Sequence, residues 1–106
     1  MRAGKLRHVI TVQKLTVVKD AVGGQSKIWS DFLTGLRAEK ITSGGREFYA
    51  AQKMNEEVQV VFKTRYVGGV TSKHRVLCGG VEYDILHAAD PDGRERELLI
   101  SCKVNG

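Results

Sequence analysis

Few side chains in this sequence have the types and spacing that a catalytic or ligand-binding site requires. Three histidines could act as general bases or metal ligands, and they stand far apart in the chain: His8, His74 and His87. None has a second ligand four residues away, as a helical metal site would, and none lies beside a nucleophile motif. Because these residues form no convergent set, we predict that the protein is not an enzyme and has no catalytic residues.

Glycines and cysteines could also bind ligands, but their spacing argues against it. The glycine pairs lack the Gly-x-x-x-x-Gly-Lys and Gly-x-Gly-x-x-Gly patterns that cradle phosphates. Cys78 and Cys102 are isolated, without the Cys-x-x-Cys spacing of metal or redox centres. We therefore predict two reduced thiols, no metal and no cofactor.

Composition is typical of a single globular domain spanning residues 1–106, with 42% apolar and 27% charged residues. The net charge of +5 leaves nucleic acid open as a partner, although a basic surface alone explains it equally well. No stretch approaches the roughly 18 apolar residues of a membrane span. The first residues, MRAGKLRHVITV, also lack the apolar segment of a secretion signal, so we expect no membrane association.

Alternating apolar residues predict strands along most of the chain. Val60, Phe62 and Thr64 share one face of the segment VQVVFKTRY. Further strands are predicted in HVITVQKL, in QSKIWSDFLTGLRAEK, on both sides of the turn Gly79-Gly80 and in RELLISCKV. About six strands separated by turn signals predict a mainly β fold, either a small barrel or a sandwich.

The inward faces of these strands are expected to meet in one core. Its expected members are Ile10, Val12, Trp29, Val60, Phe62, Ile85, Leu98 and Ile100. Trp29, the single tryptophan, is expected to anchor this core or to cover one end of a barrel.

Residues 41–57, ITSGGREFYAAQKMNEE, are predicted to form a short helix in a central insertion. Gly44 or Gly45 can cap its start, and Glu47 suits the positive end of the helix dipole. A narrow apolar stripe recurs at every third position: Phe48, Ala51 and Met54. Because a helix of about 10 residues is marginal alone, the segment either caps the open end of a barrel or is a movable element.

Basic residues gather only at the start of the chain: Arg2, Lys5, Arg7 and His8. Elsewhere they are dispersed, and the tyrosines form no stacking motif like that of an RNA-recognition domain. The basic start is either an electrostatic contact or a solvated terminus.

Short motifs follow one another in order over nearly the whole chain. They are GKLRHVITVQ, the pair Gly23-Gly24, Trp29, Ala38, GREFYAAQ, RVLCGG, YDI and ELLISC. Each motif alone is weak, but the ordered set resembles the head–tail joining proteins of tailed bacteriophages, also called head closure or stopper proteins.

The resemblance implies a β-barrel protomer that assembles into a homo-oligomeric ring, typically a dodecamer, in the head–tail connector of the virion. Such a ring retains packaged double-stranded DNA and offers the tail its attachment surface. The implied partners are the connector adaptor above the ring and the tail terminator or other tail proteins below it. The protein would be made in the host bacterial cytoplasm.

In the family, the insertion before the long central strand projects into the channel and helps to close it, and residues 41–57 correspond to it here. The resemblance thus implies a channel gate formed by Ile41, Gly44, Gly45, Arg46, Glu47, Phe48, Tyr49, Gln52 and Lys53. Of these, we expect Arg46 and Lys53 to face the DNA. Two alternatives stay open, a tail terminator ring and, as a weaker hypothesis, a nucleic-acid-binding β-barrel.

Overall fold

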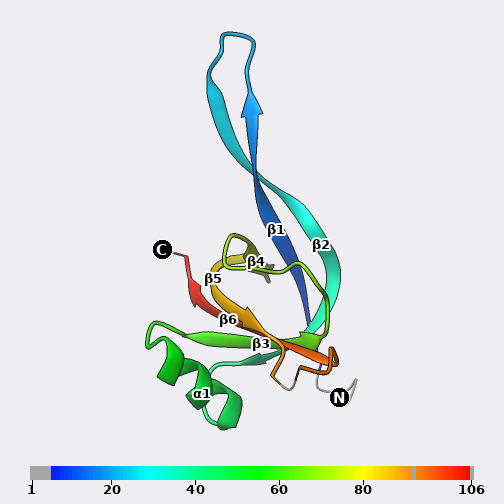
Figure 1. Ribbon diagram of the computed structural model, residues 1–106, viewed down its shortest axis with the longest axis vertical. Helices are drawn as coiled ribbons and strands as arrows, with labels where there is room; N and C mark the ends of the chain where they lie inside the picture. The colour runs from blue at the N-terminus through cyan, green and yellow to red at the C-terminus, as the bar shows by residue number, and fades with distance from the viewer. Residues whose placement is uncertain (1–5, 92, 106) are drawn as a thin grey trace.

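The computed structural model describes residues 6–91 and 93–105. The strands and the helix of this part follow one another as β1 (His8–Lys19), β2 (Gln25–Ile41), α1 (Arg46–Met54), β3 (Val60–Arg65), β4 (Arg75–Cys78), β5 (Val81–Ala89) and β6 (Glu97–Val104). The strands close into an antiparallel barrel in the order β1-β2-β3-β6-β5-β4 (Figure 1). This arrangement confirms the predicted mainly β barrel with one helix, and it decides against the sandwich.

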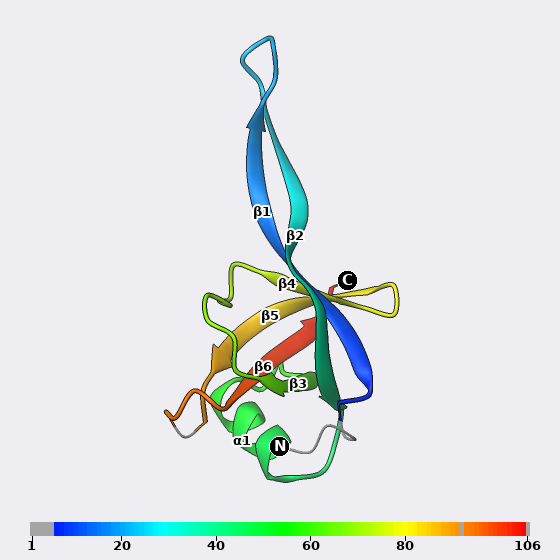
Figure 2. The same ribbon diagram turned by 90° about the vertical axis from the view of Figure 1, so that its right-hand side faces the viewer.

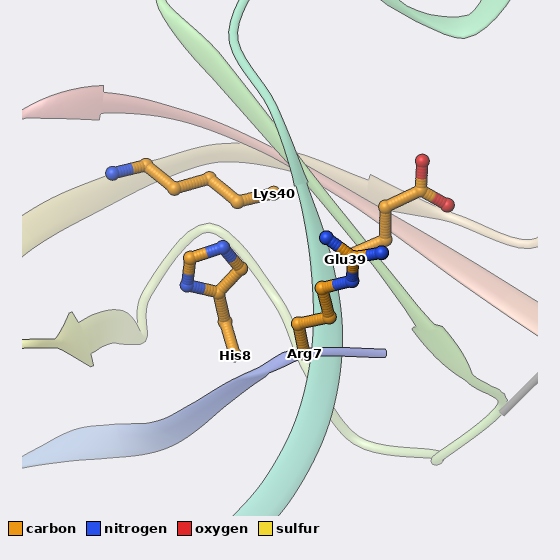
Figure 3. A pocket seen from close by; sticks show the side chains of 4 residues that line it. All are labelled: Arg7, His8, Glu39 and Lys40. Carbon is orange, nitrogen blue, oxygen red and sulfur yellow. The ribbon is translucent and has the colours of Figure 1, made fainter. Parts of the chain in front are cut away.

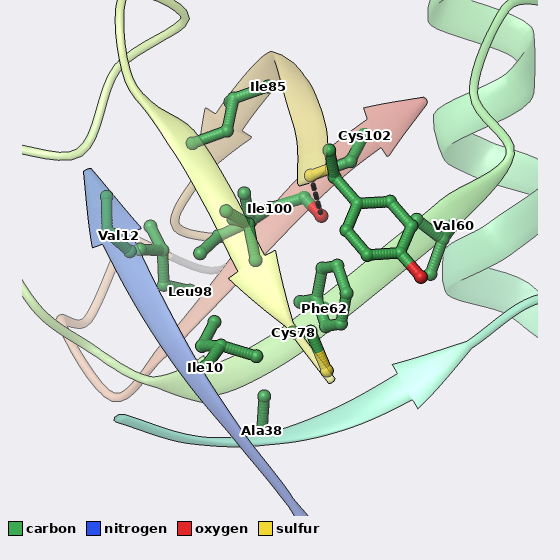
Figure 4. Packing of buried hydrophobic residues seen from close by; sticks show 12 residues of the cluster. Ile10, Val12, Ala38, Val60, Phe62, Cys78, Ile85, Leu98, Ile100 and Cys102 are labelled. Atoms are coloured by element: carbon green, nitrogen blue, oxygen red, sulfur yellow. Dashed lines mark hydrogen bonds between the residues drawn. The ribbon is translucent and has the colours of Figure 1, made fainter. Parts of the chain in front are cut away.

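The barrel interior is filled by the inward-facing residues of every strand, as the period of two requires. Its buried apolar side chains are Ile10, Val12, Ala38, Val60, Phe62, Val76, Cys78, Tyr83, Ile85, Leu98, Ile100 and Cys102 (Figure 4). Phe62 lies at the centre with no exposed surface, and its ring meets Tyr83 edge-on at 5.2 Å between centroids. All the predicted core residues except Trp29 are in this cluster.

The prediction that Trp29 belongs to the core is wrong. Trp29 is only partly buried and belongs to neither cluster of buried residues in the described part of the chain. The reason is that β1 and β2 continue far beyond the barrel as a two-stranded ribbon, and Trp29 pairs with Leu15 on that ribbon. At Trp29 the two strands have already left the barrel, so its ring has no barrel interior to fill.

This ribbon, residues 14–30, is called the arm below, and it dominates the shape of the molecule. β1 pairs with β4 only from Thr11 to Gln13, and β2 pairs with β3 only from Ala38 to Ile41. Both strands of the arm therefore have an outer edge without a strand partner among the described residues. The molecule measures 51 × 27 × 27 Å, and the arm forms its long axis (Figures 1 and 2).

The helix α1 packs on the outside of the barrel rather than across its end. Phe48 and Ala51 are buried against Val58 and Val61, with Ile41, Leu86 and Leu99 beside them. Val61 points outward from β3, and the helix covers it completely. The expected third residue of the apolar stripe, Met54, is 73% exposed at the last position of the helix.

Candidate assembly interface

The residues predicted to form a gate divide into two groups on and around α1. Phe48 is buried, and Ile41, Glu47 and Gln52 are partly buried. The exposed members are Gly44, Gly45, Arg46, Tyr49 and Lys53. The buried group holds the insertion against the barrel, which leaves the exposed group available to a partner.

Polar contacts complement the apolar docking of α1. Nζ of Lys63 on β3 donates to Oε1 of Glu47 at 3.0 Å and lies 3.5 Å from Oε2 of Glu97 on β6. The hydrogen bond from Lys63 lowers the pKa of the Glu47 carboxyl below its ordinary value. Nε2 of Gln52 also donates to the carbonyl oxygen of Val58 at 3.3 Å. Lys63 thus ties the first turn of the helix to two barrel strands.

The outward face of α1 carries both residues that were predicted to face DNA. Arg46, Tyr49 and Lys53 are spaced three and four residues apart, so they lie on one side of the helix. All of them are exposed. Arg46 and Lys53 therefore share one surface of the helix, and Tyr49 lies between them in the sequence.

The start of α1 depends on backbone conformations that favour glycine. Gly45 is the N-cap residue, with φ of 90° and ψ of 158°, and no side chain caps the helix. Gly44 also has a positive φ, of 67°. The expected glycine cap is confirmed at Gly45.

A second structural feature, which sequence reasoning missed, is the root of the arm, where β1 and β2 leave the barrel. The guanidinium of Arg75 on β4 stacks 4.4 Å from the centroid of the Trp29 ring. Its Nε donates to Oε1 of Gln13 at 2.8 Å, and its Nη1 lies 3.1 Å from Oε2 of Glu82. Nε2 of Gln13 in turn donates to Oδ1 of Asp31 on β2 at 3.0 Å. Arg75 thus contacts β1 at Gln13, just below the arm, and β2 at Trp29 within it.

The connection between β3 and β4 contacts β2 at Phe32, just below the arm. The ring of His74 stacks on Phe32 with 4.7 Å between centroids. The backbone N–H of Thr71 donates to Nδ1 of His74 at 3.0 Å, which fixes the ring orientation. A Cβ at Gly69 would lie 3.2 Å from the edge of Phe32, so a larger residue would press on this stack. His74 is therefore placed as a support for the arm.

The arm exposes apolar side chains on both of its faces. Leu15 and Val17 are 42% and 52% exposed, and Val18 and Ile28 are 42% and 49% exposed. Because cross-strand partners share a face, Leu15 and Val17 lie on the face of Trp29, while Val18 lies on the opposite face with Ile28. Val22 at the tip is 92% exposed. Such an apolar ribbon is typical of a surface that a partner covers.

A shallow hollow lies where β1 begins beside the end of β2. Its lining residues are Arg7, His8, Glu39 and Lys40 (Figure 3). Of the basic residues predicted at the start of the chain, Arg7 and His8 are exposed here, and Arg2 and Lys5 lie outside the described residues. Nζ of Lys40 lies 5.6 Å from the centroid of the Tyr83 ring at the end of the barrel. The hollow thus gathers Arg7, His8 and Lys40 around one carboxylate, Glu39.

The two cysteines are free and buried in the barrel. Burial raises the pKa of the Cys102 thiol far above its ordinary value, which favours the neutral form. Among residues 6–91 and 93–105, no three histidine, cysteine or acidic side chains gather as a metal site. No helix in the same part of the chain is long and apolar enough to cross a membrane.

Comparisons with known proteins identify one matching family and several similar structures. A family model described as phage head completion protein matches residues 1–105. No curated protein sequence matches the chain. A protein of Shigella flexneri 2a with a known solution structure is 24% identical, with a TM-score of 0.77 over 100% of this chain and 98% of that one. A chain in the virion of a native gene transfer agent particle is 19% identical, with a TM-score of 0.59 over 92% of this chain and 93% of that one. These two likenesses show a shared fold.

Proposed function

Because the chain belongs to the phage head completion protein family, we propose that it is the head closure protein of a tailed phage. In this role a homo-oligomeric ring, a dodecamer, sits beneath the connector adaptor, retains the packaged double-stranded DNA and offers its lower surface to tail proteins. The observation that carries the proposal is the family match over residues 1–105. The exposed apolar arm supports it, since an assembled ring would cover such a surface.

The proposed channel gate is the insertion at residues 41–57. The insertion suits the role of a gate because it packs as a separate unit on the barrel surface. Phe48 and Ala51 belong to a cluster apart from the barrel interior, so the insertion can change position while the interior stays packed. Lys63 holds the helix through one partly exposed ion pair, with Glu47, and such a contact is weak.

The exposed face of α1 suits a channel through which DNA must later leave. Arg46 and Lys53 give each copy two positive charges, and a ring repeats them around the axis. A dense basic patch would hold the phosphate backbone strongly and in a salt-dependent way, which would oppose release. Two dispersed cations for each subunit instead provide a weak contact that adds up over the ring.

Two other functions compete with head closure. A tail terminator ring would share the virion location and the need for assembly, but it would act on the tail tube. A nucleic-acid-binding barrel would use the basic start of the chain and the hollow at Arg7, His8 and Lys40. Neither alternative accounts for the family match as directly as head closure does.

Electron microscopy of particles made without the chain separates these functions. Head closure predicts DNA-free heads without tails, alongside free tails of normal length. A tail terminator predicts heads that stay full and tails of irregular length. A nucleic-acid-binding barrel outside the virion predicts normal particles. Either of the last two outcomes would overturn the head closure proposal.

The gate proposal has its own test, in which residues 45–54 are deleted. The deletion uncovers Val61, so it is made together with Val61→Thr, and Val61→Thr alone is the control. Because the interior cluster does not include the helix, we expect the barrel to fold and the ring to dock on heads. We expect the DNA to leak only with the deletion. Retention equal to that of the control would show that closure lies elsewhere in the ring.

A further inference from the structure

The arm has a free edge where its strand β1 continues beyond β4. The last pair between these two strands joins Gln13 to Arg75, and β1 runs on to Lys19 (Figures 1 and 2). Residues 14–19 therefore pair with β2 on one side and have no strand partner on the other side among the described residues. At such an edge every second residue presents its backbone N–H and C=O outward. This segment, residues 14–19, is called the β1 edge below.

A hollow of about 530 Å³ marks the start of the β1 edge. Its lining residues are Lys14, Leu15, Thr71, Lys73 and His74. Lys14 and Leu15 are consecutive in a strand, so their side chains lie on opposite faces of the arm. A hollow that both of them line therefore lies at the edge between the two faces, beside the segment that leads into β4. A strand added along the β1 edge would begin in this hollow.

The hollow carries positive charge that this chain does not balance. Lys14 and Lys73 are exposed, and the ammonium group of neither one has an ion-pair partner among the described residues. The backbone N–H of Thr71 donates to Nδ1 of His74, so a neutral ring has its proton on Nε2 and can donate from there. None of the described lining residues is acidic. Hydrogen-bond donors therefore surround the hollow, and they suit a carboxylate.

The rest of the arm has the same sign of charge. Three lysines and one carboxylate lie in residues 14–30: Lys14, Lys19, Lys27 and Asp20. The carboxylate of Asp20 is already engaged, because it accepts hydrogen bonds from two backbone N–H groups of the turn. Lysines on an edge strand oppose pairing with a strand of like charge. A second copy of the arm is therefore disfavoured as the occupant of the β1 edge, and an acidic strand is favoured.

The backbone of the β1 edge distinguishes a protein segment from DNA as that occupant. An outward strand edge presents both N–H donors and C=O acceptors, and another extended peptide satisfies both. The phosphates of DNA only accept hydrogen bonds, so they would leave the C=O groups of the edge without partners. Leu15 and Val17 are also 42% and 52% exposed, and they offer apolar contact to the side chains of a peptide. An extended protein segment therefore fits the edge better than a phosphate backbone does.

A third strand would also stabilise the arm. A two-stranded ribbon is marginally stable in water by itself, whereas three strands with an apolar face can be stable. The root already holds the ribbon in place, since Arg75 stacks on Trp29 and donates a hydrogen bond to Gln13. Because the arm is ordered before binding, it loses less conformational freedom when a partner docks.

We propose that the β1 edge binds an extended acidic segment of another protein, which adds to the arm as a third strand. The backbone of this segment pairs with residues 14–19, and one of its carboxylates enters the hollow lined by Lys14 and Lys73. The proposal gives the arm a partner of defined chemistry. It concerns the arm and not the insertion at residues 41–57, so it can fail while head closure stands, and the reverse also holds.

Two synthetic peptides test this inference on the purified full chain. The acidic probe alternates glutamate with valine, and the basic probe has lysine in place of each glutamate. Binding is followed by NMR titration, and hydrogen exchange is measured at each backbone amide. We expect the acidic probe to bind at least about tenfold more tightly than the basic probe and to slow exchange at every second residue of the β1 edge. No binding of the acidic probe, or binding that leaves exchange at the edge unchanged, would overturn the inference.

A charge reversal in the hollow supplies the matched test. Lys14→Glu with Lys73→Glu reverses two charges that line it. The control, Lys27→Glu with Arg37→Glu, makes the same change in net charge at exposed residues of β2 that do not line it. We expect the first variant to lose at least about tenfold in affinity for the acidic probe and to gain binding of the basic probe, while the control changes much less. Equal affinities of the two variants for the acidic probe would overturn the inference, and so would protection of the β1 edge by a short DNA duplex instead of by the acidic probe.

Discussion

The guanidinium of Arg75 lies 4.4 Å from the centroid of the Trp29 ring. These residues are on β4 and β2, which are not neighbours in the barrel. The stack therefore joins the body of the barrel to the arm at a point that strand pairing does not reach. It explains how a two-stranded ribbon keeps a defined direction outside the barrel.

Replacing Arg75 with alanine should loosen the arm and leave the barrel folded. The variant loses the contact with Trp29 and the hydrogen bond to Gln13, which together should cost about 1–3 kcal/mol. Trp29 is the single tryptophan, so its fluorescence reports on the arm alone. We expect a red-shifted emission and faster hydrogen exchange at residues 14–30. Lys73→Ala is the control, and an Arg75→Ala spectrum equal to it would refute the role of Arg75.

Replacing Phe62 with alanine should destabilise the whole barrel. Its side chain is fully buried and packs edge-on against Tyr83, so the loss should be about 3–5 kcal/mol in urea unfolding. Phe32→Ala, at a ring that is 37% exposed, should cost much less. A loss below about 1 kcal/mol for Phe62→Ala would contradict the packing of the interior.

The contact between Glu47 and Lys63 should make the docking of α1 depend on pH. The folded state holds the pKa of Glu47 below its ordinary value of 4.5, chiefly through the hydrogen bond from Lys63. The stabilisation is therefore present above about pH 4.5 and is lost as the pH falls through the lowered pKa. Because the pair is partly exposed, we expect less than about 1 kcal/mol.

Urea unfolding of the wild type and of Glu47→Gln should check this linkage. The two proteins should differ at pH 7, and the difference should shrink toward pH 3. Glu57→Gln is the control, because the Glu57 to Lys103 pair at 3.2 Å is more exposed. A difference that stays constant with pH would show that Glu47 acts by packing alone.

The two glycines before α1 should respond differently to asparagine. Nothing lies within 4 Å of a Cβ built on either glycine, so backbone conformation decides the outcome. Gly44 has a φ of 67°, a left-handed conformation that asparagine tolerates. Gly45 combines φ of 90° with ψ of 158°, a region that is essentially restricted to glycine. Gly45→Asn should cost about 1–3 kcal/mol and Gly44→Asn much less. Equal losses in urea unfolding would contradict this assignment.

The barrel could be predicted because its strands follow a simple rule. Val60, Phe62, Leu98 and Ile100 alternate with polar or covered residues, and a period of two places them on one face. The turn at Gly79-Gly80 was equally visible, and both glycines have positive φ. Local patterns thus sufficed wherever the chain buries its own apolar residues.

The arm could not be predicted for the same reason. Leu15, Val17 and Ile28 have the same β-branched and aliphatic character as core residues, but this chain does not cover them. A sequence pattern shows that a residue is apolar, but it does not show whether the same chain or another molecule packs on that residue. The same limit misplaced Trp29, whose contact is with Arg75, 46 positions later in the sequence.

The sequence located the helical insertion correctly, but not which of its side chains stay exposed. The periodic stripe identified Phe48 and Ala51, which are buried. The period of two places Val61 on the face opposite Val60 and Phe62, and α1 covers it there. The packing of α1 on the barrel decides which side of the helix stays exposed. The exposed face that Arg46 and Lys53 share could therefore be identified only from the fold.

The central claim is that this protein closes the filled head, and the DNA protected from nuclease in each particle tests it most directly. Particles are made without the chain, treated with nuclease, and compared with particles to which the purified chain is added before treatment. We predict that the protected DNA is lost without the chain and is retained at full length after its addition. Equal, full-length protected DNA in both samples would contradict the claim.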